Sequence, residues 1–174
     1  MYFNAPYESP IGPLTIVSTA THVRQILFAG ESFTAPAGES LQWGHGEPPV
    51  LGQTKRWLAD YFAGRMPAIM SLPLEPVGSD FRRLIWYLLC QIPYGQVRTY
   101  GELAREAAAR LGKDTMSAQA IGGAVGHNPL PIIIPCHRVV GANNRLTGYR
   151  GGIEKKVFLL HHEGFDKSRF SWRT

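Results

Sequence analysis

The pattern of hydrophobic and polar positions changes near residue 76. Before it, the apolar runs 14–18 and 23–28 are bounded by glycine and proline and predict the strands of a hairpin. A polar stretch rich in glycine and proline follows from 32 to 49. Aromatic and aliphatic residues at helical spacing then predict a helix over 54–63. Beyond a proline-rich connector the pattern is mostly helical, so we expect two parts, residues 1–76 and 77–174.

The second part begins with three sites that favour helix starts. Ser79 precedes an apolar stripe at positions i, i+3, i+4, i+7 and i+8, which predicts a capped amphipathic helix that ends before Pro93. Thr99 with Glu102 three residues later forms a capping-box pattern. Ser117 is suited to cap a further helix over 118–126. The last two helices, joined by a short turn, have the outline of a helix-turn-helix.

The final helix is predicted over residues 153–163, followed by a polar tail over 165–174 that we expect to be partly mobile. Its core candidates are Ile153, Val157, Phe158, Leu159 and Leu160.

The helix expected over 118–126 carries three glycines, Gly122, Gly123 and Gly126. Each glycine inside a helix costs roughly 1 kcal/mol relative to alanine, so the composition is a poor choice for stability alone. Small residues allow a close approach to another surface. A neighbouring helix and a nucleic-acid groove fit this pattern equally well.

Composition narrows the class of protein. The chain has 174 residues, a net charge of +5 and a pI near 9.4, which favours polyanionic partners but is common among soluble proteins. No long apolar run, secretory signal or phosphate-binding glycine motif is present, so we expect neither a membrane partner nor a cofactor. Two cysteines, Cys90 and Cys136, make no disulfide framework, and we predict a cytoplasmic protein.

The candidate chemistry lies at Cys136 and His137, which follow the aliphatic stretch over 132–134. Val139 and Val140 continue this strand-like run beyond them. Adjacent residues do not suit a metal pair, but a thiol beside a basic group suits a nucleophile. Glu163 is a candidate to orient the histidine. By count alone, His161 and His162 are equally available as the base.

The block Pro135-Cys136-His137-Arg138-Val139 resembles the active-site signature of the O6-alkylguanine-DNA alkyltransferases. Other matching landmarks, in order, are Tyr94-Gly95-Gln96-Val97, Thr99-Tyr100, the glycine-bearing helix, Asn128-Pro129, Tyr149 with Gly151-Gly152, and Glu163-Gly164. The resemblance covers roughly residues 79–164. It implies an α/β (α+β) fold in two parts: a ribonuclease-H-like domain with an antiparallel sheet, then a mostly helical domain with a winged helix-turn-helix.

The resemblance also implies DNA repair by direct damage reversal. The second helix of the motif would enter the minor groove of double-stranded DNA, and the damaged nucleotide would be flipped into a pocket. Cys136 would take the alkyl group from O6-methylguanine irreversibly, as a suicide methyltransferase; O4-methylthymine is left open as a substrate. His137 would act as base through a bridging water, Glu163 would orient His137, and the Tyr100 hydroxyl would supply a proton to the base.

The remaining site residues are carried over by the same resemblance. Asn128 would brace the loop before the cysteine. The pocket wall would be formed by Val139, Tyr149 and Arg150. DNA contacts would come from Gly101, Gln119, Ala120 and Gly123. Many family members have an arginine where this chain has Gln119, so we expect flipping to persist with a different duplex-binding strength. No cysteine precedes Cys90, so we expect no metal, and we expect a monomer.

Three other functions compete with this interpretation. A cysteine hydrolase could use Cys136, His137 and Glu163, but such enzymes usually place the base on a distant element. A lesion-recognition protein that binds DNA without alkyl transfer would not need Cys136. A transcriptional regulator could use the same helices, but the chain shows no effector domain.

Overall fold

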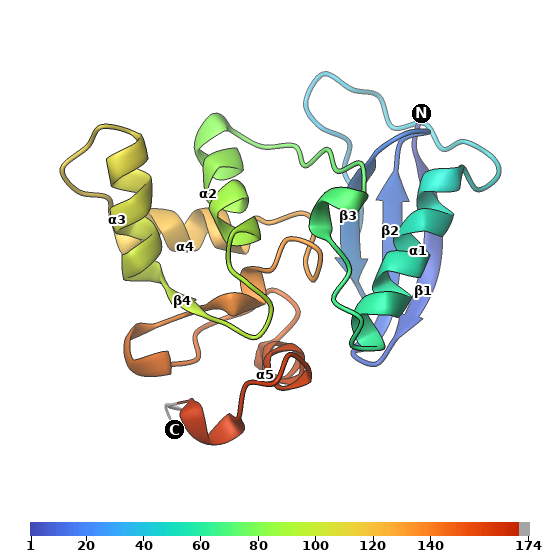
Figure 1. Ribbon diagram of the computed structural model, residues 1–174. Coiled ribbons are helices and arrows are strands. Elements are labelled where there is room, and N and C mark those ends of the chain that lie inside the picture. The colour runs from blue at the N-terminus through green and yellow to red at the C-terminus, as the bar shows by residue number, and fades with distance from the viewer. Residues whose placement is uncertain (171–174) are drawn as a thin grey trace. The chain divides into compact units, whose positions relative to one another are not determined.

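The computed structural model describes residues 1–170 and divides the chain into two compact units, one from Met1 to Val77 and one from Gly78 onward. The first unit is built on a sheet and the second is mostly helical (Figure 1). The expected mixed α/β class, with an antiparallel sheet followed by a helical part, is therefore confirmed.

The first unit is an antiparallel three-stranded sheet with one α-helix on it. The strands β1 (Phe3–Ser9), β2 (Gly12–Ser18) and β3 (Val23–Phe28) lie in the order β1-β2-β3. Helix α1 (Pro49–Phe62) covers one face of the sheet (Figure 1). Its apolar side chains are buried there: Val50, Leu51, Trp57, Leu58 and Tyr61. A short 3₁₀ helix, Ile69–Ser71, follows.

The predicted hairpin is confirmed as β2 and β3, but two features of this unit differ from the sequence prediction. Strand β1 was not predicted, because Pro6 interrupts its strand pattern; β1 lies at the sheet edge, where a missing N–H is tolerated. Helix α1 begins at Pro49 rather than residue 54. Proline is favoured in the first turn, since its N–H would have no partner there.

Up to residue 170, the second unit contains four α-helices and one pair of short strands. They are α2 (Asp80–Cys90), β4 (Arg98–Thr99), α3 (Tyr100–Arg110), α4 (Ala118–Gly126), β5 (Val139–Val140) and α5 (Ile153–His162). The strands β4 and β5 pair in parallel. Three short 3₁₀ helices lie at Cys136–Arg138, Ala142–Asn144 and Lys167–Arg169.

All three predicted helix caps are confirmed. The Ser79 hydroxyl accepts from the Arg82 N–H at 3.3 Å, and the Ser117 hydroxyl accepts from the Ala120 N–H at 3.0 Å. Thr99 and Glu102 form the complete capping box at the start of α3. These contacts fix where α2, α3 and α4 begin, and so fix the two helices of the helix-turn-helix.

Helices α2, α3 and α4 pack against one another (Figure 1). The buried face of α4 is Ile121, Ala124 and Val125. The indole N–H of Trp86 on α2 donates to the Ala124 carbonyl at 2.9 Å. This bond and the apolar contacts hold one face of α4 inward, which leaves the face with Gln119 and Gly123 exposed.

The predicted strand over 132–140 is wrong except for β5. The segment before Cys136 folds as turns, and Ile132 adopts a left-handed φ of 74° although it is β-branched. Pro129, Pro131 and Pro135 remove three backbone donors from this stretch, so it cannot form a regular ladder.

One prediction for the end of the chain also needs correction. Phe158, a predicted core residue, is 39% exposed. In the tail, which the sequence analysis expects to be partly mobile over 165–174, Phe165 and Phe170 are buried with Val140 and Leu160. Residues 171–174 lie outside the described residues.

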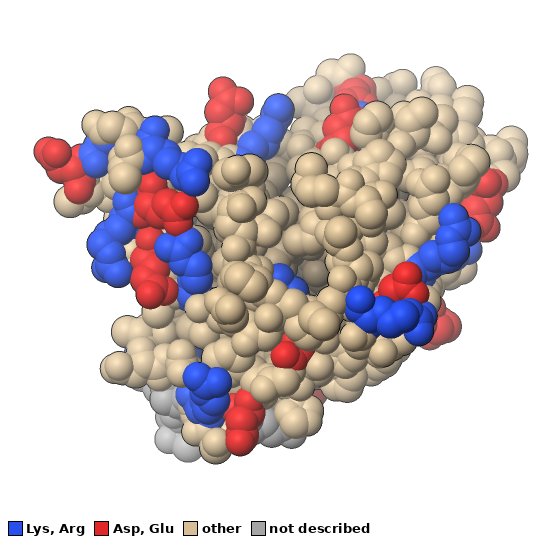
Figure 2. Space-filling view, in the orientation of Figure 1, with Lys and Arg blue, Asp and Glu red and all other residues tan. Residues whose placement is uncertain are grey.

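The net positive charge does not form a uniform patch over α3. Figure 2 shows acidic and basic side chains interleaved over this helix. Glu106 forms ion pairs with both Arg98 and Arg110. Charge alone therefore does not mark a nucleic-acid surface there. Within residues 1–170, every helix is too short or too polar to cross a membrane.

Gly95 offers a test of how tightly the turn before β4 fits the end of α5. Its φ is 75°, and a Cβ there would lie 2.9 Å from the Glu163 carbonyl oxygen. We expect Gly95→Ala to lower the free energy of unfolding in urea by about 2–4 kcal/mol, through backbone strain and overlap together.

Gly112→Ala is the matched control, because Gly112 also has a positive φ, of 64°, but an added Cβ meets nothing within 4 Å. We expect Gly112→Ala to lower the free energy of unfolding by only about 1 kcal/mol. Equal losses in the two variants would show that the overlap at Glu163 does not matter.

Candidate active site

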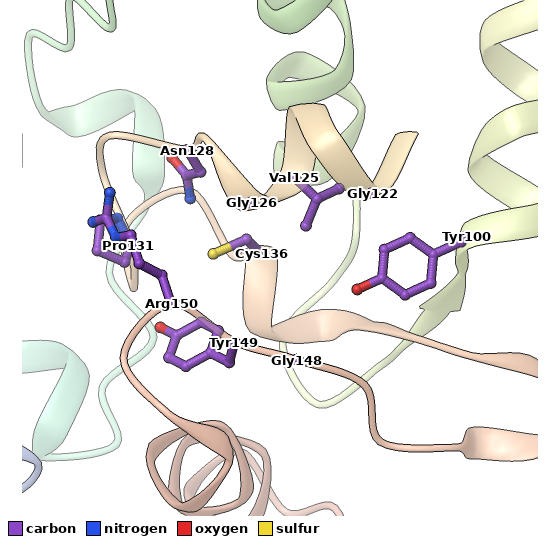
Figure 3. Close-up of a pocket in the computed structure, with 10 residues that line it drawn as sticks. All are labelled: Tyr100, Gly122, Val125, Gly126, Asn128, Pro131, Cys136, Gly148, Tyr149 and Arg150. Atoms are coloured by element: carbon purple, nitrogen blue, oxygen red, sulfur yellow. The ribbon is translucent and has the colours of Figure 1, made fainter. Parts of the chain in front are cut away.

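Cys136 lies at the start of a short 3₁₀ helix that leads directly into β5. Its side chain is 7% exposed and faces a pocket of about 450 Å³ (Figure 3). The pocket is lined by Tyr100, Gly122, Val125, Gly126, Asn128, Pro131, Cys136, Gly148, Tyr149 and Arg150. Contributions thus come from α3, α4, the turns before the cysteine and the loop before α5.

Tyr100 lies opposite Cys136 in this pocket. It is the first residue of α3, so the Thr99 cap that begins the helix also places its ring. Figure 3 shows its hydroxyl directed into the pocket, on the side of the cysteine. Burial raises the pKa of Tyr100, so the phenol keeps its proton at neutral pH. A protonated phenol in a pocket with a thiol can act as a hydrogen-bond donor or acid.

Asn128 braces the turns that carry the cysteine. Its amide nitrogen donates to the Ile134 carbonyl at 2.8 Å, and its amide oxygen accepts from the Leu130 N–H at 3.0 Å. The Cys136 N–H donates to the same Ile134 carbonyl at 2.8 Å. One buried side chain therefore satisfies backbone groups that the prolines prevent from pairing in a strand.

The thiol of Cys136 is protonated in the resting site. Burial raises its pKa, and this effect is opposed by a hydrogen bond from Asn128, by the positive charges of Lys156 and Arg150, and by a hydrogen bond from its own backbone. The pKa nevertheless stays above its ordinary value. Because the thiolate is the reactive form of cysteine, any nucleophilic reaction of Cys136 requires a base that removes the thiol proton.

Behind the cysteine, His137, Arg138 and Glu163 form a buried network. The His137 Nε2 lies 2.7 Å from Glu163 Oε1. Arg138 donates to both carboxylate oxygens, at 2.8 and 2.9 Å, and to the Ile92 carbonyl at 2.7 Å. The Gly95 N–H also donates to Glu163, at 3.2 Å. The carboxylate is therefore held by two side chains and one backbone amide.

The protonation of this network follows from its burial. Burial alone would raise the pKa of Glu163, but His137 and Arg138 outweigh it and hold the pKa well below its ordinary value. Burial lowers the pKa of His137 despite the neighbouring carboxylate. A neutral His137 whose Nε2–H donates to Glu163 carries its basic lone pair on Nδ1.

The structure brings most of the expected site residues together. Cys136, Tyr100, Asn128, Tyr149 and Arg150 share one pocket, and His137 and Glu163 are paired behind it. Val139, expected in the pocket wall, is fully buried outside this lining. The expected DNA-contact residues lie elsewhere: Gln119, Ala120 and Gly123 on α4, and Gly101 in the first turn of α3.

Lys156 is a site residue that the sequence analysis missed. It is 1% exposed, and its amine donates to the Val139 carbonyl at 2.6 Å. Burial lowers its pKa to about 8. Its position was a usable signal, because a lysine at 156 falls on the apolar stripe with Ile153, Val157 and Leu160.

The buried carboxylate predicts a pH-dependent stability. A carboxyl group with a depressed pKa stabilises the fold above its ordinary pKa, 4.5 here, and this contribution is lost as the pH falls below it. We expect Glu163→Gln to lose about 3–5 kcal/mol of unfolding free energy at neutral pH, since Arg138 loses its counter-charge. Its unfolding free energy should also decline less steeply below pH 4.5 than that of the wild type.

Glu106→Gln is the control, because Glu106 also pairs with two cations but is 29% exposed. Because solvent screens these ion pairs, we expect Glu106→Gln to lower the free energy of unfolding by only about 1 kcal/mol. Urea unfolding across the acid range measures both variants. An acid decline in Glu163→Gln as steep as in the wild type would contradict the assignment.

Models of two protein-family domains match the two halves of the chain. The family model of the 6-O-methylguanine DNA methyltransferase, ribonuclease-like domain, matches residues 3–76. The model of the 6-O-methylguanine DNA methyltransferase, DNA binding domain, matches residues 80–165. The ribonuclease-like and DNA-binding assignments agree with the sheet unit and the helical unit described above.

Individual relatives agree with the family models. A methylated-DNA–protein-cysteine methyltransferase of Haemophilus influenzae is 40% identical over 158 residues, which are 90% of this chain and 83% of that protein. One of Methanosarcina acetivorans is 37% identical over 164 residues, which are 94% of this chain and 99% of the relative. The crystal structure of Mycobacterium tuberculosis OGT in complex with DNA superimposes with a TM-score of 0.75 at 37% identity, over 97% of this chain and 94% of that one. This chain therefore belongs to the 6-O-methylguanine DNA methyltransferase family.

Proposed function

We propose that the protein repairs alkylated DNA by moving the alkyl group of O6-methylguanine in double-stranded DNA to the sulfur of Cys136. The observation that carries the proposal is the pocket itself, in which a buried thiol shares one cavity with a phenol and lies beside a buried His–Glu pair. The names of its relatives, which describe methyl transfer from DNA to a protein cysteine, support the same chemistry.

The first step is removal of the thiol proton. The resting thiol is protonated, so a base is needed, and His137 Nδ1 carries the lone pair suited to this role. Glu163 accepts from Nε2–H and stabilises the imidazolium that forms. The proton passes from Sγ to Nδ1 through a bridging water.

The second step is displacement at the alkyl carbon. A C–S bond forms, the carbon–O6 bond breaks, and its electron pair returns to guanine. The guanine leaves as a neutral base because the Tyr100 hydroxyl supplies a proton. A thioether is not readily hydrolysed, so each molecule reacts once. Asn128 holds the cysteine turn, and Tyr149 and Arg150 shape the pocket.

The base must leave the duplex to reach Cys136, because the sulfur is buried. A pocket of about 450 Å³ falls in the range of sites that bind small molecules. We propose that it receives the flipped nucleotide. O4-methylthymine is a second candidate substrate with the same alkyl–oxygen bond.

The glycines of α4 support a DNA contact for its exposed face. A Cβ at Gly123 or Gly126 would meet nothing within 4 Å. Packing inside the protein therefore does not require glycine at these positions. The minor groove is about 6 Å wide, so small residues would let the helix approach it closely. We assign Gln119, Ala120 and Gly123, with Gly101 on α3, to this contact.

The competing functions fit the site less well. A lesion-binding protein without transfer needs no thiol in the pocket, and a hydrolase needs no helix-turn-helix. We propose a cytoplasmic monomer in which residues 1–76 support the fold and residues 77–174 bind DNA and accept the alkyl group.

Alkyl transfer can be tested by mass. We expect the protein, incubated with a duplex carrying one O6-methylguanine, to gain the mass of one methylene group, and peptide mapping to place it on Cys136. The conservative Cys136→Ser variant should bind the same duplex and gain no mass. An unmodified wild-type protein that still binds the lesion tightly would instead establish the recognition function.

The role of α4 predicts opposite changes in stability and DNA affinity. We expect Gly123→Leu to raise the unfolding free energy by up to about 1 kcal/mol, because it removes a helical glycine in open space. The same change should weaken binding to duplex DNA at least roughly tenfold by keeping the helix out of the groove.

Gly52→Leu on α1 is the matched control, since Gly52 is also a helical glycine whose Cβ would meet only the end of Arg56, at 3.6 Å. It should leave DNA affinity unchanged. Fluorescence anisotropy measures the affinity of each variant for duplex DNA. A Gly123→Leu variant that binds with wild-type affinity would show that this face of α4 does not contact DNA.

A further inference from the structure

Tyr100 has a hydrogen-bond partner that the proposed mechanism does not use. Thr147 lies in the loop between the 3₁₀ helix Ala142–Asn144 and α5, and its Oγ1 donates to the Tyr100 hydroxyl oxygen at 3.0 Å. The two residues are 47 positions apart in sequence, so the bond joins the start of α3 to the loop that carries Gly148 and Tyr149. It links two walls of the pocket.

We propose that Thr147 is a positioning residue for the alkyl transfer: it fixes the Tyr100 hydroxyl and directs the phenol proton toward the leaving guanine. The inference rests on the proposed function, in which Tyr100 supplies that proton. Thr147 itself touches neither the alkyl group nor the sulfur in this mechanism.

The direction of the hydrogen bond carries the argument. A phenol has one proton and can also accept a hydrogen bond on its oxygen. The two hydroxyl oxygens lie 3.0 Å apart. In the proposed arrangement Thr147 donates, so the phenol proton is not used in this contact and remains available to a group in the pocket. Figure 3 shows the Tyr100 hydroxyl directed into that space.

The same bond favours loss of the phenol proton. Burial raises the pKa of Tyr100, the hydrogen bond from Thr147 lowers it, and negative charge on Cys136 raises it again. The thiolate that attacks the alkyl group thus makes Tyr100 a weaker acid when the acid is needed. A donor that stabilises the phenolate opposes this effect.

Thr147 is itself held from two sides. Its methyl group faces Gly141, where an added Cβ would lie 3.4 Å from Cγ2. Its carbonyl accepts from Lys156 Nζ at 3.4 Å, and Lys156 also donates to the Val139 carbonyl. A β-branched side chain with a packed methyl has few rotamers, so the hydroxyl stays aimed at Tyr100.

The test is a double-mutant cycle on the rate of transfer. The protein, in excess over a duplex with one O6-methylguanine, is followed through a single turnover, and duplex affinity is measured separately. We expect Thr147→Val, which keeps the shape and removes the donor, to slow transfer at saturating protein about fivefold, the worth of one neutral hydrogen bond. Affinity for the duplex should not change.

Two further variants separate this role from general support of the fold. Thr147→Ser restores the donor and should recover transfer to within about twofold of the wild-type rate. In a Tyr100→Phe background, Thr147→Val should have no additional effect, because the residue acts through the phenol.

Several outcomes would overturn the inference. A Thr147→Val protein as fast as the wild type, or faster, would mean that the bond does not help or that Tyr100 is the donor in it. Equal slowing in the Tyr100→Phe background, or a Thr147→Ser variant as slow as Thr147→Val, would make Thr147 a structural residue. A wild-type protein that transfers no alkyl group would instead refute the proposed function, and the inference with it.

Discussion

The carboxylate of Glu163 is the interaction on which the second unit depends most. It follows the last turn of α5 and accepts hydrogen bonds from His137, Arg138 and the Gly95 backbone, so it joins three separate segments at one point. Transferring a carboxylate from water into the protein interior is unfavourable in free energy, and several hydrogen-bond donors together are needed to offset this penalty. The same contacts set the tautomer of His137. One carboxylate therefore stabilises the fold behind Cys136 and, in the proposed mechanism, orients the histidine that acts as the base.

Several features around the pocket lower the stability of the fold. Ile132 has a left-handed backbone, Lys156 is a buried amine, and α4 carries glycines that its own packing does not need. Each is unfavourable by itself. Asn128 offsets part of the cost by pairing the backbone of the proline-rich turns. Such features together distinguish a surface and pocket built for a ligand from an ordinary core.

Local chemistry explains which parts of the fold were predictable. Ser79, Thr99 and Ser117 begin their helices where the sequence predicts, because a cap bonds to residues only three positions away. The choice of His137 as the partner of Glu163 came from the family resemblance, since by count alone His161 and His162 were equally available. The turn at Ile132 and the bond from Thr147 to Tyr100 depend on contacts between distant segments, which periodicity does not reveal.

The central claim is that Cys136 is both reagent and final acceptor of the alkyl group. The most direct measurement is the amount of repaired DNA formed when a duplex carrying O6-methylguanine is present in large excess over protein. The account predicts that repair stops at one equivalent per protein molecule and that fresh protein restarts it. Continued repair beyond one equivalent would contradict the account, because a stable thioether on Cys136 allows no second turnover.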